Sequence, residues 1–206
     1  MPETEQSIIN RLLPDCYLYI SHLNEPYQYW MLPGYPDTLT DSMSVNFKDS
    51  TALGRSAPVY TFSHSGPRSI SIQLEFHRDM FEDINNFRYP KDANGDPTGP
   101  FVDGDDMADT FIKAIQAIAV PKYNLSNKAI EPPLVAIRFG REVFIKGVVS
   151  SQVQVTYKKP ILSNEKYAIV GISFTISEVD PYDASTVFTN GSFRGLTATL
   201  RTGMNF

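Results

Sequence analysis

Three short stretches of the chain combine residue types that could do chemistry. The first, His77, Arg78 and Asp79, matches the opening letters of a protein-kinase catalytic loop. That loop places an Asn five residues after its Asp, where this chain has Ile84, and no glycine-rich phosphate loop comes before it. We therefore predict a histidine at the end of a strand and an Arg–Asp ion pair, and not a kinase.

The second stretch resembles a calcium-binding loop in part. Asp92, Asn94 and Asp96 occupy the first, third and fifth positions of such a loop. The loop needs its glycine at the sixth position, but Gly95 comes fourth, and Asp103 stands at the last position, where Glu is usual. The stretch therefore predicts a plain turn without a bound metal ion.

The third stretch, residues 63–67, places a serine beside a histidine in Ser-His-Ser-Gly-Pro. Serine hydrolases use a histidine to activate the serine, but neighbours in a chain rarely face each other, and the Gly-x-Ser-x-Gly elbow is absent. The stretch predicts a polar turn. His22, His64 and His77 lie far apart with no i, i+4 pair, so they indicate no histidine-based metal site.

These stretches nominate no catalytic residue, no cofactor and no metal ligand, so the sequence predicts a protein that is not an enzyme. A hydrolase whose site is assembled from dispersed groups stays open as an alternative. Its residues would be Glu75, His77 and Asp79.

The elements that position these residues are mostly strands. Apolar and polar residues alternate from Ser69 to Phe76 and from Ala168 to Ile176, which indicates strands with one buried face. Residues 152–157 repeat the pattern, with Val153, Val155 and Tyr157 inward. Together with the apolar runs before them, these strands predict a four-stranded antiparallel meander over residues 134–182.

Two shorter strands, at residues 42–47 and 58–62, are expected in the first half of the chain, with turns after each of them. One helix is expected between the halves. From Asp103 to Val120 apolar residues recur every three or four positions, acids stand at the start, and Pro121 follows the end. The stretch 88–99 is rich in Pro, Gly, Asp and Asn and predicts an exposed loop.

The pattern predicts a mainly β fold, a β-rich α+β class, with two packed antiparallel sheets or a split barrel and one flanking helix at about 103–120. With 206 residues, of which 42% are hydrophobic, the chain suits one domain better than two. We divide it into an N-terminal segment at 1–33, a β domain at 34–182 and a C-terminal arm at 183–206.

Composition limits the classes of function. Cys16 is the single cysteine, so an intrachain disulfide is excluded. The chain has no apolar run of about twenty residues and no signal-peptide layout, which predicts synthesis in the cytosol and no membrane anchor. A net charge of −5 argues against specific binding to duplex nucleic acid, because phosphate contacts need a basic face.

Two aromatic segments are candidates for contact surfaces. Residues 16–35 contain five tyrosines and a tryptophan, which suit either a core strand or an interface. The C-terminal arm either folds back on its own domain or docks on a neighbouring subunit. The interface candidates are Tyr29, Trp30, Tyr89, Asp96, Phe188, Phe193 and Leu196.

Several motifs are similar in order and spacing to those of one group of viral proteins. They include Gly-Tyr-Pro-Asp at 34–37, Leu-Gly-Arg-Ser-x-Pro at 53–58 and Glu-Val-Asp-Pro-Tyr at 178–182. Over about 34–182 the chain resembles baseplate hub and tail-tube-associated proteins of contractile bacteriophage tails. Related hub proteins often add a LysM peptidoglycan-binding module after this part.

The resemblance implies a tube-like fold and a structural role at the baseplate hub or tube end. It also implies a homo-oligomeric ring, hexameric in the family, with other baseplate and tail-tube proteins as partners. The protein would be made in the host cytoplasm and located in the virion, and DNA would pass through its lumen. Two alternatives stay open: the equivalent part of a contractile injection or secretion machine, and a carbohydrate-binding β-sandwich on the tail.

Overall fold

The computed structural model describes residues 16–50, 57–96, 98–124, 129–131, 133–140 and 143–179. The described chain is mainly β with two helices, which confirms the predicted fold class. The candidates Phe188, Phe193 and Leu196 lie outside the described residues, as does the C-terminal arm.

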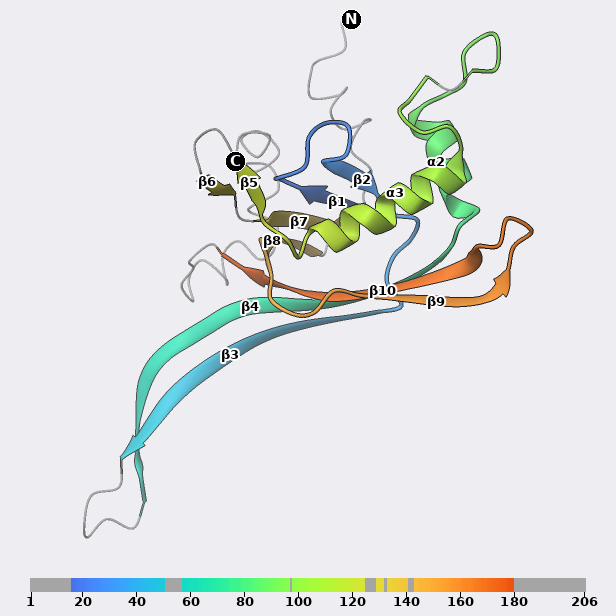
Figure 1. Cartoon of the computed structure of the whole chain (residues 1–206). Coiled ribbons are helices and arrows are strands. Elements are labelled where there is room, and N and C mark those ends of the chain that lie inside the picture. The colour runs from blue at the N-terminus through green and yellow to red at the C-terminus, as the bar shows by residue number, and fades with distance from the viewer. Residues whose placement is uncertain are drawn as a thin grey trace, which may run out of the picture.

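The ten described strands are β1 Cys16–Ile20, β2 Tyr29–Met31, β3 Thr38–Ser50, β4 Val59–His77, β5 Lys122–Asn124, β6 Ala129–Glu131, β7 Leu134–Phe139, β8 Val143–Val149, β9 Gln154–Ile161 and β10 Tyr167–Glu178. Eight of them form one antiparallel sheet in the order β2-β1-β7-β8-β10-β4-β3, with β9 also paired to β10 (Figure 1). The outermost strands β2 and β3 do not pair with each other, so the sheet is not closed into a barrel. Strands β5 and β6 pair separately.

The four strands expected over 134–182 are present, but they do not form a simple meander. Strand β9 pairs with the first part of β10, and β8 pairs with its last three residues on the same edge. Strand β10 therefore joins two halves of the sheet, β2-β1-β7-β8 and β9-β10-β4-β3. The residue expected inward on β9, Tyr157, is 45% exposed because β9 lies at an edge.

Strands β3 and β4 are longer than the sequence predicted. Residues 63–67 lie inside β4, so the turn predicted there is wrong. Gly66 and Pro67 stand opposite the single residue Ser44 of β3, which makes a β-bulge. A Cβ on Gly66 would lie 2.0 Å from the Oγ of Ser44, so glycine gives the room that this close approach requires. The turn-forming residues thus bend a continuous hairpin.

Helix α3 spans Gly104–Ala117 and confirms the predicted helix. Asp103 caps its start, since its Oδ1 accepts a hydrogen bond of 2.7 Å from the backbone N–H of Asp106. The buried stripe of the helix comprises Met107, Ala108, Phe111, Ile112, Ala114 and Ile115.

A second helix, α2, spans Met80–Arg88 directly after β4 and was not predicted. It has nine residues and buries only Phe81, Ile84 and Asn85, so its sequence shows little helical periodicity. The ring of Phe81 lies 5.1 Å from that of Phe111, which packs α2 against α3. Neither described helix is long and apolar enough to cross a membrane.

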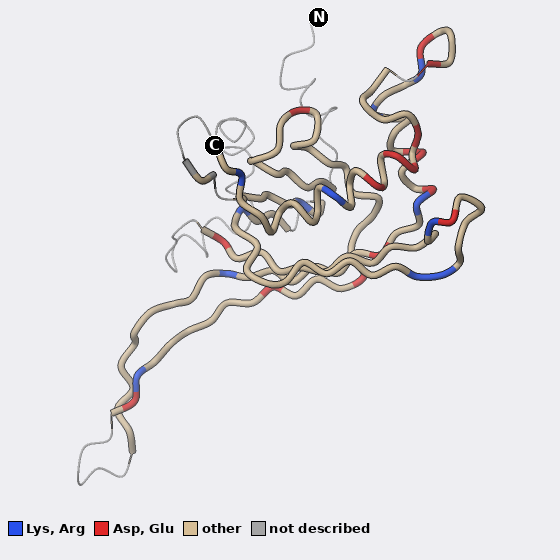
Figure 2. The backbone as a smooth tube through the Cα atoms, in the orientation of Figure 1, with Lys and Arg blue, Asp and Glu red and all other residues tan. Residues whose placement is uncertain are grey.

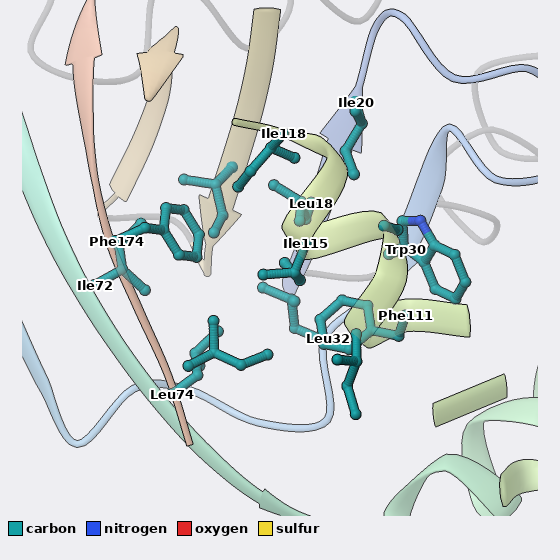
Figure 3. Packing of buried hydrophobic residues seen from close by; sticks show 14 of the residues in the cluster. Leu18, Ile20, Trp30, Leu32, Ile72, Leu74, Phe111, Ile115, Ile118 and Phe174 are labelled. Carbon is teal, nitrogen blue, oxygen red and sulfur yellow. The ribbon is translucent and has the colours of Figure 1, made fainter. Parts of the chain in front are cut away.

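Side chains from both halves of the sheet and from α3 meet in one core, shown from close by in Figure 3. Residues 16–33, set apart in the sequence as an N-terminal segment, contribute β1, β2 and the buried Leu18, Ile20 and Trp30. Each fully buried aliphatic or aromatic side chain of this kind stabilises a fold by roughly 1.5–3 kcal/mol. Burial of this apolar cluster holds the two halves against the helix.

A cluster of charged side chains, Arg78, Asp105, Asp109 and Lys166, fastens α3 to the sheet. The Nη1 of Arg78 lies 2.9 Å from Asp105 and 2.6 Å from Asp109, and its Nε donates to the carbonyl of Tyr167 at 2.8 Å. Lys166 approaches the same two carboxylates within 2.5 and 2.6 Å. Arg78 therefore pairs with two carboxylates of helix α3. The sequence had predicted an ion pair with its neighbour Asp79 instead.

Replacing Arg78 by Gln should lower the free energy of unfolding by about 2 kcal/mol, because the charge-assisted hydrogen bonds from Arg78 to two carboxylates are lost while Lys166 still pairs with both. Lys113→Gln, on the exposed side of α3, is the control and should change stability by less than about 0.5 kcal/mol. Urea unfolding followed by circular dichroism measures both. Equal stability of the two variants would show that the cluster contributes nothing.

Partial burial pushes the pKa of Asp109 up, but hydrogen bonds from Lys166 and Arg78 push it further down, to below its ordinary 3.8. A carboxyl with a lowered pKa in the folded state stabilises the fold above its unfolded pKa, and this contribution is lost as pH falls through the folded pKa. We expect Asp109→Asn to lower the melting temperature at pH 7. The difference in melting temperature between the variant and the parent protein should become smaller as pH falls below about 4. A difference that stays constant would contradict this.

Candidate assembly surface

The structure places the HRD stretch at the end of β4, where His77 is the last residue, as predicted. The Nδ1 of His77 lies 3.3 Å from Oδ2 of Asp79. Glu75, the third residue of the hydrolase alternative, instead forms an ion pair with Lys158 of β9. The three groups are therefore not gathered into one site.

The adjacent Ser63 and His64 do face each other, so the expectation that they would not is wrong. The Oγ of Ser63 lies 3.2 Å from Nδ1 of His64, and the other ring nitrogen lies 3.1 Å from Nδ2 of Asn46. All three side chains are exposed on the surface of the β3–β4 hairpin. An exposed pair lacks the water-excluded setting in which such groups gain catalytic strength.

The stretch at 92–96 is a turn, as predicted. The carboxylate of Asp92 accepts hydrogen bonds from the backbone N–H groups of Asn94 at 2.8 Å and Asp96 at 2.9 Å. Its oxygen Oδ1 is thus engaged by the chain itself. In the part of the chain that the structure describes, no three His, Cys, Asp or Glu side chains are grouped to hold a metal ion.

The aromatic interface candidates are placed differently from one another. Trp30 is 0% exposed, and its indole N–H donates to the carbonyl of Tyr27 at 2.8 Å, so it belongs to the core. Tyr29 and Tyr89 are half-buried, with the Arg88 guanidinium 5.0 and 5.1 Å from their ring centres. Burial raises the pKa of Tyr29. The fourth described candidate, Asp96, is exposed.

The half β9-β10-β4-β3 turns one face to the core and the other to solvent, and we call the second the bare face. It carries hydroxyl and amide side chains in rows across the strands: Thr38, Thr40, Ser42, Ser69, Ser71, Gln73, Gln154, Thr156, Ser173 and Thr175. Glu75 and Lys158 on this face neutralise each other. A groove of about 220 Å³ lies over Gly171, which has no side chain to fill it.

Both edges of this half lack a neighbour among the described strands. Strand β3 pairs with β4 alone, and β9 pairs with β10 alone. Unpaired N–H and C=O groups along such edges are ready to pair with another chain. Strand β9 carries Lys158 and Lys159, which form its blue stretch in Figure 2. Lysines on an edge strand hinder non-specific pairing with other chains.

The β3–β4 hairpin extends beyond the sheet, and we call residues 43–50 and 59–67 the distal ribbon. Ser69 is the first residue of β4 that pairs with β10, so the part of the hairpin before it has no third strand beside it and projects away from the core (Figure 1). Cross-strand partners share a face, so the paired Phe47 and Phe62, with ring centres 5.8 Å apart, mark one face. Alternation places Val45 and Tyr60 beside them, and Asp49, the cross-strand partner of Tyr60, lies on the same face. The ribbon thus has an exposed apolar face.

The opposite face of the distal ribbon is polar. Cross-strand pairs of Asn46 with His64 and of Lys48 with Thr61 lie on it. No residue of the distal ribbon was among the interface candidates predicted from the sequence. The signal that could have found them is the alternation around Phe47 and Phe62, which Ser and Gly residues interrupt.

The base of the distal ribbon is fixed by Arg68, which is 9% exposed. Its Nε lies 3.0 Å from both carboxylate oxygens of Asp41, and its Nη2 lies 2.6 Å from Oδ2. Its Nη1 donates to the carbonyl of Phe144 in β8 at 3.4 Å. The base of the ribbon is therefore tied to the other half of the sheet.

No family model matches the chain, and no curated protein matches it in sequence. Among solved structures it is similar to a chain in the virion of a native gene transfer agent particle, with 14% identity, a TM-score of 0.36, and coverage of 82% of this chain and 96% of that one. A chain in the tail of an empty gene transfer agent particle, refined with C6 symmetry, gives 14%, 0.35 and the same coverage. Overlap at this level does not establish a shared function.

The distal ribbon should exchange its amide hydrogens fast in the free chain, because a two-stranded ribbon without a third strand is only marginally stable. We expect amides of 45–49 and 60–64 to exchange at least about 100-fold faster than those of 170–176 in β10. Hydrogen exchange with mass spectrometry on dilute protein measures this. Equal protection in the two regions would mean that the ribbon is stable by itself.

Proposed function

We propose that this chain is a structural subunit of a phage tail, and that copies join head to tail through β3 of one and β9 of the next to close a ring. The observation that carries the proposal is that, among the described strands, neither β3 nor β9 has a neighbour at the outer edge of the half β9-β10-β4-β3. A ring closed in this way leaves no edge exposed and uses one heterologous contact repeated by cyclic symmetry.

Strand direction is compatible with this contact. The four strands β9, β10, β4 and β3 alternate in direction, since each neighbouring pair is antiparallel. The β3 strand of one copy therefore meets the β9 strand of the next in the antiparallel sense. Six copies, the number that the family resemblance implies, would make a barrel of about 24 strands, wide enough for an aqueous channel.

The shape of the subunit favours the bare face as the channel lining. Helix α3 and the half β2-β1-β7-β8 cover the other face (Figure 1). In a closed ring the bulky side of a wedge needs the larger circumference, so the uncovered face turns to the axis. The hydroxyl and amide groups there are neutral, and Lys158 is paired with Glu75, which suits the passage of DNA without specific binding.

A place at the baseplate hub or tube end of a contractile tail is the finer form of the proposal. It is supported by the motifs at 34–37, 53–58 and 178–182, and it makes other baseplate and tube proteins the partners. The corresponding part of a contractile injection machine shares these motifs and is the alternative. The carbohydrate-binding alternative is less favoured, because Trp30 and Tyr17 are buried and cannot stack on a sugar ring, which leaves Tyr27 and Tyr35 as the exposed aromatic residues of the segment 16–35.

Intersubunit disulfides test the ring. In a Cys16→Ser background, one cysteine on β3 (at Thr38, Thr40 or Ser42) is combined with one on β9 (at Gln154 or Thr156). Oxidation of concentrated protein should give a ladder of covalent oligomers, ending at six, for at least one combination. Non-reducing gels and mass photometry measure the ladder.

The matched control pairs a cysteine at Thr156 with one at Lys113 on α3, a position away from both edges. It should give no ladder under the same oxidation. Monomers alone from every β3–β9 combination, in protein concentrated to the millimolar range, would refute edge-to-edge assembly.

A further inference from the structure

We propose that Asn94 is a site of spontaneous covalent modification, at which the side-chain amide is lost and an aspartyl or isoaspartyl residue is formed. The site lies in the turn 92–96, within the loop that joins α2 to α3 and projects away from the sheet (Figure 1). Asn94 and Gly95 are both exposed, so water reaches the amide and the peptide bond between the two residues. The inference does not depend on the proposed ring.

The reaction needs no reagent other than water. The backbone nitrogen of Gly95 loses its proton and attacks Cγ of Asn94, and the C–N bond of the side-chain amide breaks, so that ammonia leaves and a cyclic imide remains. Water then opens the imide at one of its carbonyl carbons. Opening at Cγ gives an ordinary aspartate. Opening at the backbone carbonyl gives isoaspartate, whose main chain passes through Cβ.

Gly95 gives this attack the room that it needs. A Cβ at this position would have no heavy atom within 4 Å, so the space around the peptide bond is open. Glycine also adopts the φ of +86° found here without strain. The N–H of Gly95 donates to the carbonyl of Asp92 at 3.0 Å. This turn bond lies at the surface, where local opening exchanges it for water and frees the nitrogen.

The amide of Asn94 is free to rotate toward that nitrogen. Its backbone N–H donates to Asp92, but its side chain makes no hydrogen bond within the part of the chain that the structure describes. The other exposed asparagines with described side chains are each held by a partner: Asn24 by Lys122, Asn46 by His64, Asn86 by Glu82 and Asn164 by Asp105. Each of those four is followed by a residue larger than glycine. Among them, Asn94 alone combines a free amide with a following glycine.

The modification changes the tip of the loop and leaves its base. Thr98 donates to the carbonyl of Pro90 at 2.6 Å, and Gly99 packs against the ring of Tyr89, so the base is closed without Asn94. At the tip, the N–H groups of residues 94 and 96 both bind Oδ1 of Asp92. Isoaspartate lengthens the main chain between these two donors and disrupts the shared acceptor. The new carboxylate also takes the net charge of the chain from −5 to −6.

Incubation of the folded, full-length protein at mildly alkaline pH tests the inference, because the nitrogen of Gly95 loses its proton more readily there. Trypsin releases residues 92–113 and 159–166 as separate peptides, which contain Asn94 and Asn164. Mass spectrometry follows the replacement of the amide by a carboxyl group, and an isoaspartyl methyltransferase with labelled S-adenosylmethionine detects isoaspartate. We expect Asn94 to convert at least about tenfold faster than Asn164, which Glu165 follows.

The matched variant is Asn94→Gln, which keeps a neutral amide at the same exposed position but must form a larger ring to react. Its peptide should stay unmodified while that of the parent protein converts, and circular dichroism should show the same fold for both. A second Asn-Gly pair, Asn190 and Gly191, lies outside the described residues and in a different tryptic peptide, so it does not enter the measurement.

The parent chain unfolded in guanidinium chloride provides the decisive comparison. If the turn permits the attack, Asn94 should convert in the folded protein at a rate within about tenfold of that in the unfolded chain. A folded protein that keeps Asn94 intact while the unfolded chain converts would overturn the inference, because the turn would then protect the amide. Equal rates at Asn94 and Asn164 in the folded protein would overturn it as well.

Discussion

The whole structure depends on the pairing of β10 with three other strands. Val170, Ile172, Phe174 and Ile176 on its inner face are at most 3% exposed, and its edges carry β4 on one side and β9 and β8 on the other. Because β8 meets only its last residues, the sheet can bend there and enclose α3 between its halves. Without this strand the core would divide into two uncovered sheets.

The same arrangement explains why the assembly surfaces are where they are. Burying one face of β9-β10-β4-β3 leaves the other bare, and the covering half joins through β8 to the last residues of β10, which leaves the outer edges of β9 and β3 without a neighbour among the described strands. The free edges, the bare face and the distal ribbon are thus three results of one topology. In a single free chain these surfaces have no partner. Water solvates them, and lysines and β-bulges keep the strand edges from pairing with other chains.

The sequence predicted those elements whose pattern is local and regular. Alternation at 69–76 and 168–176 and the stripe of α3 needed no tertiary information. The continuation of β4 through Gly66 and Pro67 could not be predicted, because turn residues serve there in a bulge that only the partner strand defines. Pairing of Arg78 with α3, and burial of Trp30, likewise depend on residues distant in sequence. The ribbon was missed as a surface because Ser and Gly residues interrupt the alternation around Phe47 and Phe62.

The Arg68 anchor has a mechanical consequence. Its guanidinium grips Asp41 on the hairpin and the carbonyl of Phe144 on β8, so the ribbon is not a free lever hinged at its base. A pull along the ribbon is shared at once with the strand at which the sheet bends, and the load is spread over many backbone hydrogen bonds that must yield together. Through Arg68, tension on the hairpin is therefore transmitted to β8 and to the core of the subunit.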